Sequence, residues 1–394
     1  MNKIYVQATL LSAATMTVMA GAIVSPSLPN ISEVFSDNPH IDILSKLVIT
    51  VPALFVATFS PLAGRVADRL GRMPLIIGSL CLYALGGTSA YLLDNIYLIL
   101  VSRAVLGIAV AGTMTSVVTL AGDYYQGEER KSFLGLQGAF MALGGVIFVL
   151  LGGVLADISW RSPFLVYLLS LPVGILAFFI LKEPTLGQES SGKDQHKGFS
   201  ALPSLSWLIY ANIFFGMILF YMIPVQIPFL LKELDIQQNY LSGVAIGVGT
   251  FFSAITSISY RKLSQKFSFP AFFAIAYLLI GSGYGLISLA NGLTLVIVGL
   301  AVAGLGIGLL IPNTNIWLLS ILPERIRGFG TGISGTFLFM GQFLSPIAVR
   351  PLIDAYSLST AFGLALIPAA VLCALFVVMH FQNNSGKLKK ALTN

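Results

Sequence analysis

Twelve long apolar segments, separated by short polar breaks, constrain this chain of 394 residues more than any other feature. Each segment is long enough, or nearly so, to cross the roughly 30 Å hydrocarbon core of a bilayer as a helix. Only 10% of the residues are charged, whereas soluble globular domains carry about 25%. The sequence therefore predicts an all-α membrane protein, with spans near residues 5–30, 45–66, 74–93, 96–121, 133–156, 164–181, 205–231, 240–260, 270–290, 293–319, 330–352 and 360–381.

The basic residues predict how these spans are oriented. An even number of spans places both termini on one side of the membrane, and cytoplasmic loops are enriched in Lys and Arg. If the N-terminus is inside, most of the 22 Lys and Arg residues fall in cytoplasmic segments, and only Lys46, Arg161, Lys232 and Arg350 lie outside or near it. We therefore expect a multi-pass protein with both termini in the cytoplasm. The same bias accounts for the net charge of +6, so no nucleic-acid partner is expected.

The longest polar stretch between spans, residues 182–204, is rich in Gly, Ser, Gln and Lys. Such a composition is typical of a flexible linker, which we place in the cytoplasm. It separates an N-terminal six-helix bundle, residues 1–181, from a C-terminal six-helix bundle, residues 205–381. Residues 382–394 are expected to form a cytoplasmic tail.

The two predicted bundles also repeat in sequence. At one offset of about half the chain, Asp157 falls on Asp354 and Arg130 falls on Arg327. Parallel repeats of this kind are found in transporters, which bind substrate near the midplane between the halves and rock the halves alternately. The repeat therefore favours alternating access over a channel.

Residues 64–72, with the sequence GRVADRLGR, form a charged segment between the second and third spans. Three arginines are enough to orient a loop, so Asp68 among them predicts a specific partner. A carboxylate is favoured at the N-terminus of a helix, and the helix that opens near residues 330–332 in the other half is the candidate. We predict that this contact closes the inner mouth; the alternative is that the arginines only set topology.

Together these features resemble the major facilitator superfamily over essentially the whole chain. That family carries G-x-x-x-D-R-x-G-R-R, or a close variant, between its second and third helices, and Met73 stands here in place of the last basic residue. The residues that match are Gly64, Asp68, Arg69, Gly71 and Arg72. The resemblance implies two six-helix bundles related by a pseudo-twofold axis, and it adds Asp123, at the cytoplasmic end of helix 4, as a partner for Arg72 in the inner gate.

Within that family the chain resembles the twelve-helix drug-efflux group, which consists of drug:proton antiporters. The proline pair Pro26 and Pro29 and the pair Arg103 and Gly107 carry this likeness. The antiporter pattern of helix 5, G-x8-G-x3-G-P-x2-G-G, is only partly present, because residues 148–149 are Phe-Val where Gly-Pro belongs. The glycines that match it, and that would let helices 5 and 8 approach closely, are Gly135, Gly144, Gly152 and Gly153.

Arg103 is a charge inside a span, which costs at least about 2.5–3.5 kcal/mol at the centre of a membrane helix. It therefore needs a partner, yet the spans of the first half have no acidic residue at midplane depth. Two interpretations remain open. Arg103 either braces helices through backbone carbonyls or polar groups such as Ser25, or it attracts an anionic or zwitterionic substrate.

By the same resemblance, helices 1, 4, 7 and 10 should line the substrate cavity. Helices 7 and 10 are interrupted by Pro224, Pro228 and Pro312, and interrupted helices at corresponding positions indicate a binding site. The predicted lining, together with Arg103, consists of Thr15, Thr113, Thr115, Asn212, Phe215, Tyr221, Gln226, Asn313, Asn315 and Trp317. Neutral hydrogen-bonding groups among apolar residues favour an amphiphilic, weakly charged substrate.

The sequence thus predicts a secondary active transporter that exports small amphiphilic molecules, with the proton as coupling ion, in a bacterial inner membrane. It is not expected to be an enzyme or to bind a cofactor or a metal, and one chain, a monomer within the lipid bilayer, should enclose the whole pathway. One alternative is a dedicated exporter of an anionic metabolite or siderophore, with Arg103 matching its charge. A second is a non-transporting receptor or scaffold on a transporter fold.

Overall fold

The computed structural model describes residues 3–183 and 202–384, apart from the side chains of residues 131 and 325. Over these residues the chain is helical, without strands, and twelve helical segments are long and apolar enough to cross a membrane. The predicted number of spans and the all-α class are therefore confirmed. The protein is a multi-pass membrane protein.

The first half contains seven spanning or part-spanning helices. They are α1 (Lys3–Ala22), α2 (Leu28–Val34), α3 (Ile41–Leu70), α4 (Arg72–Thr88), α5 (Ile96–Tyr124), α6 (Gly127–Ile158) and α7 (Ser170–Ile180). Short 3-10 helices join them: η1 (Ser25–Ser27) between α1 and α2, η2 (Ser89–Tyr91) after α4, and η3 (Ser162–Leu169) before α7. The first span is thus broken near Pro26 and Pro29, since proline has no N–H to continue the helical ladder.

The second half contains six spanning helices, all of them long. They are α8 (Ser204–Glu233), α9 (Asn239–Leu263), α10 (Phe269–Ser288), α11 (Leu293–Ile321), α12 (Arg327–Ala355) and α13 (Leu358–Asn384), with η5 (Glu324–Ile326) before α12.

Several helices extend past the apolar segments that predicted them. Helix α3 continues to Leu70, so most of the charged segment 64–72 is helical rather than a turn. Its Arg, Ala and Leu residues are good helix formers, and after Gly64 no further glycine or proline occurs before Gly71, where φ is +97°. Asp68 therefore projects from the last turn of a helix.

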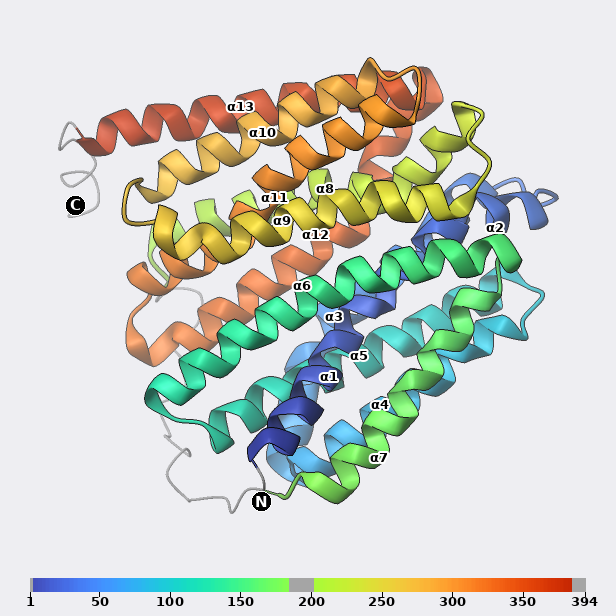
Figure 1. Cartoon of the computed structure of the whole chain (residues 1–394). Helices are drawn as coiled ribbons and strands as arrows, with labels where there is room; N and C mark the ends of the chain where they lie inside the picture. The colour runs from blue at the N-terminus through green and yellow to red at the C-terminus, as the bar shows by residue number, and fades with distance from the viewer. Residues whose placement is uncertain (1–2, 184–201, 385–394) are drawn as a thin grey trace.

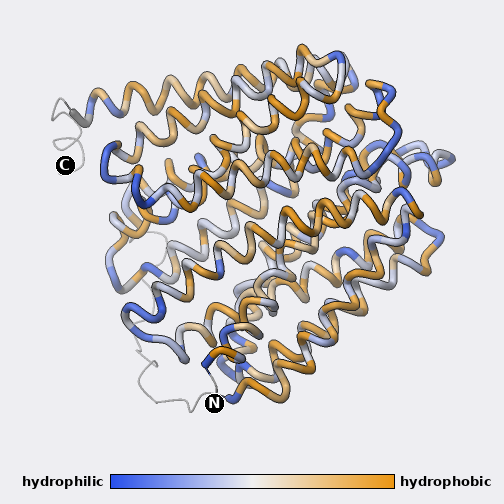
Figure 2. The backbone as a smooth tube through the Cα atoms, viewed as in Figure 1, coloured by the Kyte–Doolittle hydropathy of each residue, from blue (hydrophilic) through white to orange (hydrophobic). Residues whose placement is uncertain are grey.

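The helices form two bundles, α1–α7 and α8–α13, that lie side by side (Figure 1). Helix α1 begins and α13 finishes at the same end of the molecule. We call this the arginine end, because Arg65, Arg69, Arg72 and Arg327 lie there, and we call the other the opposite end. Polar residues gather at the two ends and apolar residues along the helices between them (Figure 2), as a bilayer requires.

The hydrophobic cores of the halves merge only toward the opposite end. Tyr221 and Val225 of α8 pack into the core that surrounds Met19 and Ile23 of the first half. Likewise Val149 of α6 belongs to the core of the second half. At the arginine end, by contrast, the core of the first half contains only residues of that half among those described. The halves therefore meet at the opposite end and diverge toward the arginine end (Figure 1).

Helices α6 and α9 form the closest part of this contact. A Cβ atom on Gly153 of α6 would lie 2.9 Å from the carbonyl oxygen of Asn239, and one on Gly243 of α9 would lie 2.7 Å from the carbonyl oxygen of Val149. Toward the arginine end, Gly135 and Gly138 of α6 have nothing within 4 Å of such an atom. We call the stretch at Gly153 and Gly243 the glycine seam.

Substituting Gly243→Val should separate the halves at the opposite end, because overpacking a close contact costs about 1–3 kcal/mol. Spin labels at Asp37 and Gln237, both exposed in opposite-end loops, would measure the separation, which we expect to increase. Gly138→Val, in the open stretch of α6, is the matched control and should leave it unchanged. If the distance between the two labels is the same in Gly243→Val and Gly138→Val, the glycine seam does not determine how closely the halves approach.

Candidate functional site

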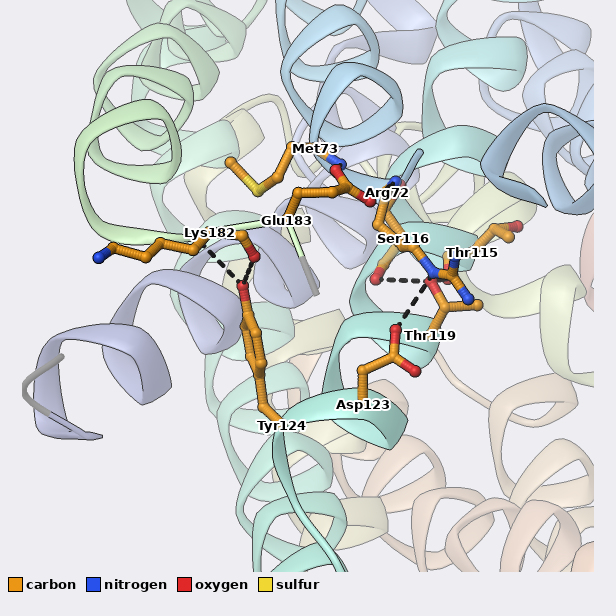
Figure 3. A network of polar contacts seen from close by, with 9 residues as sticks. All are labelled: Arg72, Met73, Thr115, Ser116, Thr119, Asp123, Tyr124, Lys182 and Glu183. Atoms are coloured by element: carbon orange, nitrogen blue, oxygen red, sulfur yellow. Dashed lines mark hydrogen bonds and ion pairs between the residues drawn. The ribbon is translucent and has the colours of Figure 1, made fainter. Parts of the chain in front are cut away.

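The N-terminus of α4 is held by a residue that sequence reasoning missed. The backbone amides of Arg72 and Met73 donate to the two carboxylate oxygens of Glu183, at 2.7 and 2.8 Å (Figure 3). A carboxylate at a helix N-terminus satisfies amides that have no helical partner. Gly71 is needed here because of its positive φ, and because a Cβ atom on it would lie 2.9 Å from the Glu183 carboxylate.

Glu183 is fixed in turn by its neighbour Lys182. The backbone amide of Lys182 donates to the hydroxyl of Tyr124 at 3.0 Å, and that hydroxyl donates to the Lys182 carbonyl (Figure 3). The expected flexible linker, residues 182–204, therefore begins with two anchored residues, while residues 184–201 lie outside the described part of the chain. The signal available in sequence was an acid directly after the sixth span.

Arg72 and Asp123, which the family resemblance pairs, form an ion pair. The Nε atom of Arg72 lies 3.1 Å from Oδ2 of Asp123, and the two side chains are 14% and 31% exposed (Figure 3). Both residues belong to the first half, in α4 and α5. The pair therefore joins two helices of one bundle and does not itself bridge the halves.

Asp68, the predicted inner latch, is exposed and has no ion-pair partner within the described ranges. Its predicted partner segment, residues 330–332, lies in the second turn of α12 rather than at its start. There the Gly330 carbonyl accepts a hydrogen bond from the Tyr210 hydroxyl at 2.9 Å. Gly64 and Gly332 face open space. The latch contact is absent from this state, because the halves diverge at the arginine end.

Arg103 is 1% exposed and is held by its own half. Its Nη2 atom donates to the carbonyl oxygens of Gly86, at 2.9 Å, and Gly87 in α4. Its guanidinium carbon lies 4.9 and 5.1 Å from the ring centroids of Phe164 and Tyr167. The planar guanidinium of arginine can stack on aromatic rings while it donates hydrogen bonds to two carbonyls, and the ammonium group of lysine does not reproduce this combination. Of the two interpretations left open, these contacts favour the brace.

The brace extends to α1 through two tyrosines. The Tyr167 hydroxyl donates to the Ala20 carbonyl at 2.8 Å, and the Tyr83 hydroxyl donates to the Met16 carbonyl at 2.6 Å. Tyr83 and Tyr167 also pack together, with ring centroids 5.6 Å apart. Arg103 therefore positions α1, which the sequence predicted to line the cavity.

Several predicted cavity residues are occupied within their own half. Asn313 accepts from the Tyr260 hydroxyl at 2.7 Å and donates to the Phe269 carbonyl at 2.9 Å. Trp317 stacks on Phe269, with centroids 5.7 Å apart and planes 9° apart. Thr113 is buried and donates to the carbonyl four residues earlier. The partners of these side chains all belong to the same half, so these contacts stabilise the individual bundles.

Among the predicted lining residues, two on helix α8 carry amide groups without a partner in the described part of the chain, and Nη1 of Arg103 also lacks one. Asn212 accepts from the Tyr277 hydroxyl at 2.7 Å, but its Nδ2 atom has no partner among the described residues. Gln226 is 1% exposed, and both polar atoms of its amide lack such a partner. A buried polar group left unpaired costs about 1–3 kcal/mol. These amides are therefore the strongest candidates to bind water or substrate.

The other predicted lining residues differ in how far they are buried. Tyr221 of α8 reaches the first half, where its hydroxyl is 3.4 Å from the Cβ position of Gly21. Thr15 is half-buried, and Phe215 is 48% exposed. The remaining two are Thr115, half-buried, and Asn315, exposed.

The four helix 5 glycines do not share one role. Gly144 and Gly152 lie against Thr15 and the Ile23 carbonyl of their own half, and only Gly153 meets the backbone of α9. Gly135 has no neighbour within 4 Å. The expected close approach of the fifth and eighth spans, α6 and α9, is thus made at Gly153. The other two buried glycines, Gly144 and Gly152, instead let α6 pack closely against the first span.

A charged cavity of about 470 Å³ lies between the halves at the opposite end. Lys232 of α8 forms an ion pair with Glu33 of α2, and Lys46 of α3 lies 5.1 Å from the ring centroid of Phe229. Sequence reasoning placed both lysines outside but assigned them no contact. They join the halves where the halves meet.

Comparisons with known proteins agree with this architecture. The sequence profile of the Major Facilitator Superfamily matches residues 10–291 and 262–393. The quinolone resistance protein NorA of Staphylococcus aureus is 25% identical over 358 residues, which cover 87% of this chain and 89% of NorA. The multidrug transporter protein MdtP of Bacillus subtilis (strain 168) is 27% identical over 184 residues, covering 46% of this chain and 33% of MdtP.

Two solved structures share the fold. A bacterial homolog of the human lysosomal transporter Spinster, in an inward-facing and occupied conformation, superposes with a TM-score of 0.76, 17% identity and 98% coverage of both chains. A D-xylose-proton symporter gives a TM-score of 0.74 at 15% identity, covering 95% of this chain and 97% of that one.

Replacing Arg103 should harm the protein even when the charge is kept. Arg103→Lys loses the stacking on Phe164 and Tyr167 and one of the two carbonyl contacts, so we expect a loss of about 2–3 kcal/mol, by analogy with other broken buried polar networks. Thermal unfolding of the purified protein would measure it. A lysine variant with wild-type stability and lost transport would instead favour a substrate ligand.

Substituting Gly71→Ala should destabilise the first half by about 1 kcal/mol or more, because alanine disfavours a positive φ and its methyl group would displace Glu183. The measurement is again the midpoint of thermal unfolding. Gly78→Ala in α4, where nothing lies within 4 Å of a Cβ atom, is the matched control and should be neutral or stabilising. Equal midpoints for the two variants would refute the role given to Gly71.

Proposed function

The chain belongs to the major facilitator superfamily, and from this premise we propose that it is a secondary active exporter of small amphiphilic molecules. One observation carries the proposal: the cores of the halves merge at the opposite end and separate toward the arginine end. That arrangement is what one state of an alternating-access cycle requires. The similarity to a quinolone resistance protein over most of both chains supports efflux of drug-like compounds.

The proposed state faces the cytoplasm. Positive residues favour the cytoplasmic side, so we assign the arginine end and both termini to the cytoplasm and the opposite end to the outside. The cytoplasmic membrane of a bacterium is the proposed location, since the relatives described above are bacterial. A monomer suffices, because both halves of the pathway belong to one chain.

The proposed substrate is neutral or weakly charged. The free groups on α8, Asn212 and Gln226, are amides that form hydrogen bonds without requiring a charge. Arg103, which the sequence suggested as the group matching an anionic metabolite or siderophore, binds carbonyls and aromatic rings of its own half. No specific contact therefore favours the anionic alternative.

Proton coupling is part of the proposal, and its group would lie outside the midplane. No Asp or Glu is buried within the described ranges. Proton-driven exporters titrate a carboxylate whose pKa depends on its surroundings. The candidates are Glu33, Asp68 and Asp123 or the substrate's own ionisable group.

Transport into proteoliposomes with an imposed pH gradient tests this function. We expect a neutral amphiphilic dye to move against the proton flow, faster than in protein-free liposomes. The variant Gln226→Leu should slow it up to about ten-fold, the value of one hydrogen bond. Thr58→Val, at an exposed position whose hydroxyl bonds only its own helix, is the control. Uptake of a hydrophilic tricarboxylate alone, or a leak that ignores the gradient, would overturn the proposal.

A further inference from the structure

A carboxylate from the first half caps a helix of the second half at the opposite end. Asp157, in the last turn of α6, accepts from the backbone amide of Asn239 at 2.6 Å and from that of Tyr240 at 3.1 Å. These are the first two amides of α9. The side-chain amide of Asn239 donates back to the Ala156 carbonyl at 3.3 Å.

This contact supplies what α9 lacks by itself. The first amides of a helix have no intrahelical acceptor, and the residue before α9, Gln238, forms no side-chain cap. Both oxygens of Asp157 fill that need, and a negative charge is favoured at the positive end of a helix. The N-terminus of α9 is therefore capped only while the halves are together.

The glycine seam places the carboxylate there. Gly153 brings the α6 backbone against Asn239 and Tyr240, and Asp157 follows one helical turn later on the same face. A wider separation of α6 and α9 would remove both hydrogen bonds at once. The cap therefore reports directly on closure of the seam.

We propose that Asp157 is a positioning residue that holds the outer mouth shut, an inference that rests on the proposed alternating access. In the inward-facing state its carboxylate latches α9 to α6. In the outward-facing state the latch is broken, and water hydrates both the carboxylate and the amides. Asp157 thereby sets the ratio of the two states.

The other contacts between the halves at this end are weaker candidates. Lys232 and Glu33 pair where their side chains are 26% and 64% exposed, and exposed ion pairs contribute little. Ser25 donates a single neutral hydrogen bond to the Pro224 carbonyl. Asp157 is also exposed, but it combines a charge with two backbone donors that α9 holds in place.

The repeat provides a matched control. Asp354 of α12 is the counterpart of Asp157 in the second half, and it lies at the same end. Its carboxylate pairs with Arg350 of its own helix at 3.2 Å, four residues away. Asp354 takes no part in the hydrogen bonds that Asp157 forms across the seam, so Asp354→Asn makes the same change in net charge without touching the latch.

The test measures both mouths in lipid nanodiscs without substrate. Spin labels at Asp37 and Gln237 report the outer end, and labels at Gln126 and Gln265, both exposed, report the arginine end. In Asp157→Asn, which keeps one acceptor but loses the charge, we expect the ratio of outer-closed to outer-open protein to fall roughly three- to ten-fold. The arginine-end distance should shorten in parallel, and Asp354→Asn should match the wild type.

Three outcomes would overturn the latch. The first is a wild-type distribution at both ends in Asp157→Asn with undiminished transport, which would leave the proposed function standing. The second is an increase of both distances together, as general loosening would give. The third is a wild-type protein with fixed distances and no transport, which would overturn the proposed function as well.

Discussion

The arrangement of the two halves depends on the close contact between the backbones of α6 and α9 at the glycine seam. Where Gly153 and Gly243 lack side chains, α6 and α9 come close enough for the cores to merge. Where α6 has no such partner, at Gly135 and Gly138, the helices have separated. Within a membrane, packing of small residues replaces the hydrophobic effect as the force between helices. The closed opposite end and the divergent arginine end both follow from where these glycines lie.

Each half is stiffened by hydroxyl groups bound to backbone carbonyls of its first helix. Tyr83 binds the Met16 carbonyl of α1, and Tyr277 binds the Asn212 carbonyl of α8, the first helix of the second half. Among the described residues, the first half adds the buried cation Arg103 to this scheme and the second half adds none. The halves are thus built alike but braced differently.

The spans could be predicted because a bilayer leaves a long apolar segment little alternative to a helix. The Arg72–Asp123 pair also followed, from the family resemblance. The partners of Glu183 and Asp157 could not be predicted, since those residues lie 111 and 82 positions from the amides they bind and no periodicity encodes such distances. The contacts of Asn313 with Tyr260 and Phe269 could not be predicted for a related reason: a polar residue on an interrupted helix looks the same in sequence whether it faces a cavity or a neighbouring tyrosine.

One consequence follows from the two prolines of α8. Pro228 has no amide hydrogen, so it cannot donate the usual helical hydrogen bond to the carbonyl of Pro224, four residues earlier. Ser25 of the first half fills that vacancy. A change at residue 25 or 228 alone would strand a buried polar atom on the opposite bundle. The two halves are therefore coupled at this point, because the amide hydrogen that proline lacks in one half leaves a carbonyl that a hydroxyl of the other half satisfies.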